Sequence, residues 1–340
     1  MGAISMLALT LGGGAVLLSA IWVAVDGLKT ENIRPGLVGL ILVSVGLVLP
    51  LDSGSARATT APSVSADPGP IANSVNLPTS PTLVARLGVA CETDAAGRAR
   101  CWGSDVPVPA GAVHRIVLGR AHGCALMQTG ELSCWGAVED SADTRSGHRF
   151  VDAASTLHTT CGLTAQGALH CFGRDLGMPP SGHRLTQITG GADHFCALTE
   201  AQHAFCWGRD TDGQLDAPAD TRFQQLSAGH FHTCGITAEG LTTCWGRTTE
   251  GQSTPPATTT FTQLSAGWAH TCGLTASGEA VCWGCENRHR DLQIGDTDAC
   301  SPPSSTFLAI AAGDLWQSCG LTPDGEVQCW GGIERQGVQR

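Results

Sequence analysis

The stretch from Ser265 to Cys285 reads "SAGWAHTCGLTASGEAVCWGC" and places two cysteines, Cys272 and Cys282, ten positions apart across a turn that contains glycine. The same spacing occurs seven times along the chain, and such self-similarity is the signature of a repeat architecture. The seven pairs are Cys91/Cys101, Cys124/Cys134, Cys161/Cys171, Cys196/Cys206, Cys234/Cys244, Cys272/Cys282 and Cys319/Cys329. The repeats cover residues 82–340, about three quarters of the chain.

Each repeat is predicted to contain a hairpin whose two strands carry the cysteines. In the segment "CGLTASGEAVC" a three-residue loop ends at Gly278, the position where such loops adopt a left-handed backbone. With this loop, Cys272 lies directly opposite Cys282, close to the distance that a disulfide needs. The register therefore predicts one cross-strand disulfide per hairpin, with reduced thiols or a metal site as the alternatives. A gap of nine residues is not the spacing of paired cysteines in structural zinc sites.

The remaining two cysteines, Cys285 and Cys300, bracket an insertion in the sixth repeat. Cys282 and Cys285 form a C-x-x-C pattern, which is also the spacing of thiol-disulfide oxidoreductases. Redox catalysis needs a helix N-terminus at the first cysteine, whereas Cys282 is expected in a strand with its own partner. We therefore predict a Cys285–Cys300 disulfide that pins the insertion.

The rest of the repeat predicts a blade-like sheet. An alternating apolar strand such as "FTQLSAG" precedes each hairpin, and Trp-Gly or Phe-Gly follows it. Three clear strands and one short irregular strand per repeat, seven times over, predict an all-β, seven-bladed β-propeller. A linear solenoid is the alternative, but neither end shows a distinct polar capping repeat. The Trp of each Trp-Gly is expected to pack between neighbouring blades, with a ligand-binding ring of Trp as the alternative.

The segments "SAGWAHTCGLTASGEAVCWG" and "SAGHFHTCGITAEGLTTCWGRTTEGQS" resemble repeats of the regulator of chromosome condensation family. They are most similar to the shorter bacterial form that is also seen in a β-lactamase-inhibitory propeller. The resemblance implies a seven-bladed propeller and a protein-binding role. Three departures argue against a chromatin or nucleotide-exchange role. The "GQLG" ending is altered, the first repeat lacks the His-Thr element, and no basic tail is present.

The N-terminal part is predicted to anchor the propeller to a membrane. Residues 3–25 are uncharged and long enough to span a bilayer, and residues 35–51 form a second, shorter apolar run. Lys29 and Arg34 between them favour a cytoplasmic loop with both termini outside. We interpret residues 1–51 as a helical hairpin, residues 52–81 as a disordered Ser/Pro/Ala/Thr-rich tether and residues 82–340 as the propeller. Alternatively, residues 35–51 belong to a signal sequence cleaved after Ala56–Ala58.

Charge and cysteine usage limit the compartment and the partners. Disulfides persist in oxidising compartments, so the propeller is expected outside the cytoplasm of a bacterium, in the periplasm or at the cell surface. The chain carries a formal net charge of −11 and shows no basic stripe, which argues against nucleic acid as a partner. No nucleophile elbow, phosphate-binding loop or His-Glu metal motif is present, so no catalytic residue, cofactor or metal is assigned.

Histidine recurs two positions before the first cysteine of several repeats, at His122, His194, His232 and His270. A ring of imidazoles near a propeller axis could bind metal or act as acid-base groups. The repetition favours a structural task instead, in which each histidine bonds to the backbone of its own turn.

Positions that vary inside the fixed motif are candidates for ligand contact. The loops between "SAG" and the next strand carry His230, Phe231 and Trp268, and the longer seventh loop carries Leu315 and Trp316. Large aromatic residues are favoured anchors at protein interfaces, so these five residues form the candidate binding face. The alternative is that the aromatic rings pack between blades.

The insertion between Cys285 and Cys300 is a second candidate contact element, through Arg288, Arg290 and Asp291. Taken together, these features predict a non-enzymatic, membrane-anchored scaffold that binds a protein or a cell-envelope component. The alternatives are an extracytoplasmic lyase or hydrolase that uses the funnel of the propeller, and an inhibitor of a secreted hydrolase. A cluster of histidines and carboxylates around an open cavity would favour the enzyme.

Overall fold

The computed structural model describes residues 76–77, 80–103, 106–137, 147–177, 179, 182–285, 299–314 and 317–331. The elements found in these residues are 21 β-strands. Within the same residues there is no helix of the length and apolarity that a membrane crossing requires. The predicted membrane segments, residues 3–25 and 35–51, and the tether as far as residue 75 lie outside the described residues.

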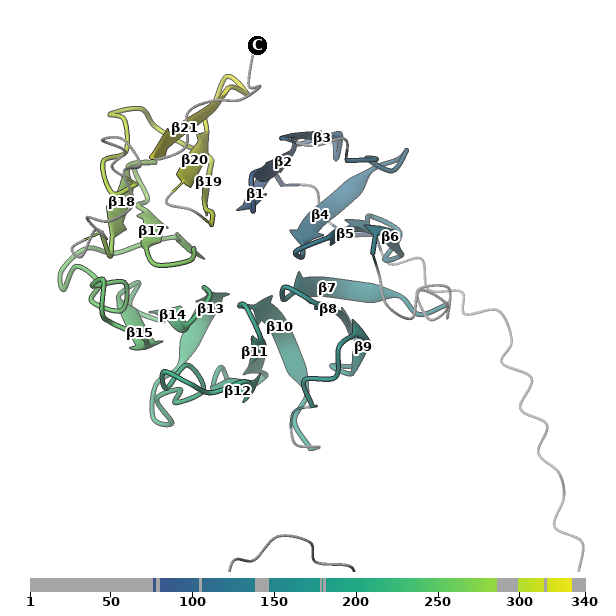
Figure 1. Ribbon diagram of the computed structural model, residues 1–340, viewed down its shortest axis with the longest axis horizontal. Helices are drawn as coiled ribbons and strands as arrows, with labels where there is room; N and C mark the ends of the chain where they lie inside the picture. The colour runs from purple at the N-terminus through teal and green to yellow at the C-terminus, as the bar shows by residue number, and fades with distance from the viewer. Residues whose placement is uncertain are drawn as a thin grey trace, which may run out of the picture. The chain divides into compact units, whose positions relative to one another are not determined.

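The strands form seven three-stranded antiparallel sheets, each built from three consecutive strands. Figure 1 shows the sheets arranged side by side around a common centre, which is the arrangement of a seven-bladed β-propeller. Blade by blade, the strands are β1 Thr82–Arg86, β2 Val89–Thr93 and β3 Ala99–Trp102; β4 Val113–Leu118, β5 His122–Met127 and β6 Leu132–Gly136; β7 Phe150–Ser155, β8 Thr159–Thr164 and β9 Leu169–Gly173; β10 Leu185–Gly190, β11 His194–Thr199 and β12 Ala204–Gly208; β13 Phe223–Ala228, β14 His232–Thr237 and β15 Thr242–Gly246; β16 Gln263–Ala266, β17 Thr271–Leu274 and β18 Ala280–Trp283; β19 Ala309–Ala312, β20 Gln317–Leu321 and β21 Val327–Gly331.

The hairpin register is the one that the cysteine spacing predicts. Cys272 pairs with Cys282 across β17 and β18, and Gly278 closes the loop with φ of 83°. The fourth repeat has Gln202 in place of this glycine, and Gln202 adopts the same left-handed backbone with φ of 64°. The hairpin geometry is therefore strong enough to hold a residue with a side chain in a conformation that normally favours glycine.

All sixteen cysteines form disulfides, and the pairing confirms the prediction. Seven disulfides join opposed residues of a hairpin with Cα atoms 4.0–4.1 Å apart. They are Cys91–Cys101, Cys124–Cys134, Cys161–Cys171, Cys196–Cys206, Cys234–Cys244, Cys272–Cys282 and Cys319–Cys329. Cys285 and Cys300 form the eighth, with Cα atoms 6.1 Å apart. The C-x-x-C pattern at Cys282 is therefore shared between two separate disulfides.

The two cysteines of a hairpin differ in burial, although the spacing treats them as equivalent. The first cysteine of every pair lies on the central strand of its sheet and is at most 1% exposed. The second cysteine lies on the third strand, at the edge of the sheet, and is not fully buried. Cys101, Cys134, Cys171, Cys206, Cys244 and Cys282 are half-buried, and Cys329 is exposed. The disulfides therefore tie the edge strand of each blade to its buried centre.

The core lies between blades. Trp245 of the fifth blade is buried in a cluster with Cys196 and Leu198 of the fourth blade. Its ring lies 5.6 Å from the ring of Phe223, the first residue of its own blade. Trp283 makes the same contact with Phe261. These contacts confirm that the Trp of the Trp-Gly pairs packs between neighbouring blades.

The fourth, short strand that the repeat predicts is not formed where its segment is fully described. Residues 209–222 and 247–260 link successive blades as turns, and only an isolated bridge from His203 to Arg222 occurs there. Side-chain bonds take the place of a strand. The Gln252 side chain accepts the backbone N–H of Glu250 and closes a local turn.

Candidate functional site

The loops between the first and second strands of the blades lie together at one face of the propeller, which we call the loop face. Successive strands in a blade run antiparallel, so the hairpin loops between the second and third strands lie at the opposite face. The described segments of the loop face are residues 87–88, 119–121, 156–158, 191–193, 229–231, 267–270 and 313–314.

Backbone hydrogen bonds join these loops head to tail around the propeller. Leu157 N–H donates to Ala192 C=O at 2.9 Å, Ala192 N–H to His230 C=O at 3.4 Å, and His230 N–H to Gly267 C=O at 3.0 Å. The close approach depends on glycine, because a Cβ at Gly229 would lie 2.4 Å from the carbonyl oxygen of Gly267. The loop face is therefore a rigid platform.

The repeated histidines lie directly beneath this platform and bond across the blade boundary. Each donates or accepts a hydrogen bond with a hydroxyl one blade further on. The pairs are His122–Thr160 at 2.9 Å, His194–Thr233 at 3.0 Å, His232–Thr271 at 2.8 Å and His270–Ser318 at 2.8 Å, each measured from Nε2 to the hydroxyl oxygen. The predicted structural task is confirmed, but the predicted partner is wrong. The imidazole reaches the hydroxyl of the next blade, because the close loop packing places that hydroxyl beside it.

Burial keeps these histidines neutral. Burial lowers the pKa of His194 to about 3, and the positive charge of Arg86 lowers it in the same direction. Burial likewise lowers the pKa of His232 to about 3 and that of His270 to about 4. These imidazoles hold blades together, and they carry no charge at neutral pH.

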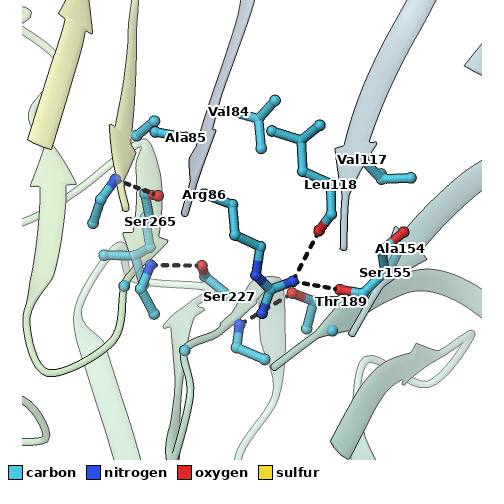
Figure 2. Close-up of a pocket in the computed structure, with 18 of the residues that line it drawn as sticks. Val84, Ala85, Arg86, Val117, Leu118, Ala154, Ser155, Thr189, Ser227 and Ser265 are labelled. Carbon is cyan, nitrogen blue, oxygen red and sulfur yellow. Dashed lines mark hydrogen bonds between the residues drawn. The ribbon is translucent and has the colours of Figure 1, made fainter. Parts of the chain in front are cut away.

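The first blade lacks this histidine and uses an arginine instead. Arg86, the last residue of β1, extends its side chain across the end of the central cavity (Figure 2). Its guanidinium donates to the carbonyl oxygens of Leu118 at 3.0 Å, Ser155 at 3.0 Å and Gly191 at 2.8 Å. One side chain of the first blade therefore binds the second, third and fourth blades.

Leu87 follows Arg86 in a two-residue turn and has a φ of 48°, an uncommon backbone conformation for a residue with a side chain. Its N–H donates to Asp314 at 3.2 Å, while its side chain is 38% exposed at the loop face. The left-handed backbone of Leu87 and Gly88 closes the two-residue turn between β1 and β2.

Asp314 of the seventh blade completes the network. Its carboxylate lies 2.7 Å from Nε2 of His230 and 3.8 Å from Nε of Arg86. Burial by itself would raise the pKa of Asp314, but the hydrogen bond from His230 and the charge of Arg86 outweigh it and hold the pKa below its ordinary value. A buried carboxylate thus links the first, fifth and seventh blades.

The first strands of the blades enclose a central cavity of about 210 Å³. Its wall is closed by side chains that accept the backbone N–H of the next blade (Figure 2). Thr189 accepts from Ala228 at 3.0 Å, Ser227 from Ala266 at 2.9 Å and Ser265 from Ala312 at 2.9 Å. Within the described ranges, no group of three or more His, Cys, Asp or Glu residues could hold a metal ion. The polar positions of the "QLSA" strands serve ring closure.

Three residues of the candidate binding face meet on the platform and form what we call the aromatic patch: His230, Phe231 and Trp268. The ring of His230 lies 5.9 Å from that of Phe231 and 6.2 Å from that of Trp268, both in edge-to-face geometry. Arg247 stacks over Phe231, with 5.6 Å between its guanidinium carbon and the ring centre. All three aromatic side chains are half-buried, and Asp314 fixes the central one.

The other predicted contact residues lie outside the described residues, namely Leu315, Trp316, Arg288, Arg290 and Asp291. Sequence reasoning missed Arg86, Leu87 and Asp314. One signal was present, since the first repeat reads "RLGVAC" where the fifth and sixth repeats read "SAG" followed by a His-containing loop. A charged residue at the end of an otherwise apolar first strand marks the blade that breaks the pattern.

Three repeats match the family model described as regulator of chromosome condensation (RCC1) repeat, over residues 185–214, 223–252 and 261–290. The structure is similar to the ectodomain of the receptor kinase CR4 from Physcomitrella patens, with 28% identity, a TM-score of 0.62 and coverage of 74% of this chain and 73% of that chain. The CRINKLY ectodomain of the receptor kinase ACR4 from Arabidopsis thaliana is 24% identical, with a TM-score of 0.61 and coverage of 74% and 94%. Yeast RCC1 (Prp20), solved with Kap60 bound, is 16% identical, with a TM-score of 0.57 and coverage of 83% and 86%. No curated protein matches the chain.

Proposed function

Because the chain carries repeats of the regulator of chromosome condensation kind, we propose that it is a non-enzymatic scaffold whose propeller binds a protein on its loop face. The observation that carries the proposal is the aromatic patch on a platform held by backbone hydrogen bonds. Large aromatic side chains that are already positioned lose little conformational freedom on binding, so they are effective anchors for a partner.

We propose that this propeller lies outside the cytoplasm. Eight disulfides are stable in an oxidising compartment, and the similar CR4 structure is the ectodomain of a receptor kinase. The apolar runs at residues 3–25 and 35–51 support anchoring in a bacterial membrane, with residues 52–81 as the tether. The propeller would then face the periplasm or the cell surface.

The proposal is tested by site-specific photo-crosslinking from the full chain in its native cells. A benzophenone amino acid is placed at Trp268, and a matched one at the exposed Ala276 in a hairpin loop of the opposite face. We expect a defined crosslinked partner from position 268 and none from position 276. Equal capture from both positions would contradict binding at the loop face.

The partner identified in this way then allows a quantitative test. Phe231→Ala and Trp268→Ala should each weaken its affinity by about 30-fold or more, the loss expected for a central aromatic anchor. Leu241→Ala, at an exposed leucine outside the patch, is the matched control and should leave the affinity unchanged. Full affinity in both aromatic variants would place the contact elsewhere.

The pair of His230 and Asp314 favours a second candidate function. A histidine held by a buried carboxylate beside a cavity is an arrangement that can act as a general base, as a hydrolase or lyase requires. Turnover of ester, peptide or polysaccharide substrates that is lost in His230→Gln would support this candidate over the scaffold.

A further inference from the structure

The residue opposite the first cysteine of each hairpin belongs to one layer around the central cavity. Ser227 on β13 pairs with Cys234, and the six other blades have the same pairing. All seven residues of this layer line the cavity. Three neighbouring blades contribute hydroxyl groups, which we call the hydroxyl arc: Thr189, Ser227 and Ser265 (Figure 2). The other four blades contribute alanine or valine, which we call the apolar arc: Val84, Val117, Ala154 and Ala311. The wall of the cavity is therefore polar on one side and apolar on the other.

The hydroxyl arc has protons that the protein itself does not use. Each of its three oxygens accepts a backbone N–H of the next blade. A hydroxyl that accepts one hydrogen bond can still donate its own proton. Among the described residues, none of these three O–H groups has a protein acceptor, and all three side chains are half-buried. The bonds that close the ring thus occupy the oxygens and leave three donors at the wall of the cavity.

The two carboxylates nearest the cavity already have partners. Asp152 accepts hydrogen bonds from Arg115 and from two backbone N–H groups. Asp314 is bonded to His230 and to one backbone N–H group. Arg115 also lines the cavity and is 40% exposed, so its remaining N–H groups add to the donors there. The wall therefore has more donors than acceptors, which favours a ligand rich in acceptors.

We propose that the central cavity binds a small organic carboxylate, with its oxygens on the hydroxyl arc and its hydrocarbon part against the apolar arc. A carboxylate accepts several hydrogen bonds at once, and bonds to a charged acceptor are the stronger ones. The volume of about 210 Å³ limits the ligand to a small molecule. Inorganic phosphate offers acceptors but no apolar part. Arg86 crosses the loop-face end of the cavity, so the ligand enters past the exposed Arg115. The site lies inside the ring and does not depend on protein binding at the loop face.

The probe is butyrate, titrated by isothermal calorimetry into the full chain in an uncharged detergent. We expect saturable binding of one butyrate per chain. Butyramide keeps the hydrocarbon part without the charge, and phosphate keeps the charge without the hydrocarbon part. Each should bind at least about tenfold more weakly, because each satisfies only one of the two arcs. The proposal is overturned if butyrate shows no saturable binding, or if butyramide or phosphate binds equally well.

Variants of the two arcs locate the site. Thr189→Val and Ser227→Ala each remove one donor and should weaken butyrate binding by roughly tenfold. Thr186→Val is the matched control on the same strand, since Thr186 is exposed outside the cavity, and it should bind butyrate as the natural chain does. Val84→Phe places a ring in the cavity from the apolar arc and should abolish binding, with thermal unfolding to verify that each variant is folded. Natural affinity in both hydroxyl variants, or in folded Val84→Phe, would place the butyrate elsewhere and overturn the proposal.

Discussion

Neighbouring blades are held together in two different ways, by neutral histidines at four boundaries and by the charged Arg86 of the first blade. Histidines at four boundaries each bond one hydroxyl of the next blade, and burial lowers the pKa of all four. Arg86 is charged and reaches three blades by itself, with Asp314 as its counter-ion. The repeated contact sets the spacing of the ring, whereas the single contact joins its beginning to its end.

This difference shows that one repeat can depart from the shared sequence pattern where closing the ring needs a contact that occurs only once. A neutral histidine can be used at every boundary, because each histidine forms a hydrogen bond with a hydroxyl of the next blade and adds no charge. Several buried arginines around one axis would repel one another, and each would need its own carboxylate. The charged network is therefore expected once, and it lies beside the aromatic patch.

The largest effect is expected from pH, because it acts on several histidine boundaries together. In the unfolded chain a histidine has a pKa of about 6.5, whereas the folded pKa is about 3 for His194 and His232 and about 4 for His270. Between these values the unfolded state binds protons that the folded state does not. The free energy of unfolding should therefore fall with decreasing pH below 6.5, by about 1.4 kcal/mol per pH unit for each histidine.

Urea unfolding at pH 7, 6 and 5 measures this slope. The triple variant His194→Gln, His232→Gln, His270→Gln should be less stable at pH 7 and show a much flatter dependence. If the natural chain has the same free energy of unfolding at pH 7 and pH 5, the buried histidines are not held neutral, and the contrast with the charged Arg86 is wrong.

Arg86→Met should give the next largest loss. It leaves the buried Asp314 without its cation and removes the donors to three carbonyl groups, which should lower the free energy of unfolding by about 3–5 kcal/mol. Arg98→Met is the matched control, since Arg98 pairs with Asp94 at 2.7 Å but both side chains are exposed, at 83% and 36%. Its loss should stay below about 1 kcal/mol. Similar losses in the two variants would mean that Arg86 has no special role.

His232→Ala should cost less than Arg86→Met, because one neutral hydrogen bond is lost. Removing the buried ring leaves the hydroxyl of Thr271 without its His partner, and we expect a loss of about 1–3 kcal/mol in thermal or urea unfolding. His158→Ala, at an exposed histidine of the loop face, should change stability by no more than about 0.5 kcal/mol. A loss in His232→Ala as large as that in Arg86→Met would show that a single histidine contact contributes as much to the free energy of unfolding as the Arg86 network.

Ser265→Ala should have the smallest effect. It removes one acceptor for the N–H of Ala312 in the wall of the central cavity, at a cost of about 0.5–1.5 kcal/mol. The exposed Ser304 gives the control variant Ser304→Ala, which should be neutral. No measurable difference between the two variants would indicate that water replaces the lost acceptor.

The fold could be predicted in detail because the cysteine spacing fixes the register of each hairpin, which is a local property of the chain. Ten positions and a three-residue loop determine the hairpin register, and repetition determines the number of blades. The predicted fourth strand was wrong, because bonds of the Gln side chain to its own turn, as at Gln252, replace strand pairing. Such competition between side chain and backbone does not show in an apolar pattern. The unequal burial of paired cysteines, as in Cys319 and Cys329, also depends on where each strand lies in its sheet.

The site could be predicted only in part. The aromatic residues His230, Phe231 and Trp268 were found because they vary inside a fixed motif, and the structure brings them together. The partner of each histidine could not be found, because it lies 38 or more residues away and depends on how closely the blades pack. The contact of Arg86 with Asp314 spans nearly the whole ring, so no local pattern predicts it.

The hairpin disulfides have a consequence for resistance to proteases. Each disulfide encloses the exposed loop at the tip of its hairpin, as Cys272–Cys282 encloses residues 275–278. Loop tips are where proteases cut most readily. A cut there opens the chain but leaves its two ends tied within the same blade, so no piece is released. Cuts between blades are the ones that would divide the chain, and the linkers that carry Gln214 and Gln252 hold those residues buried.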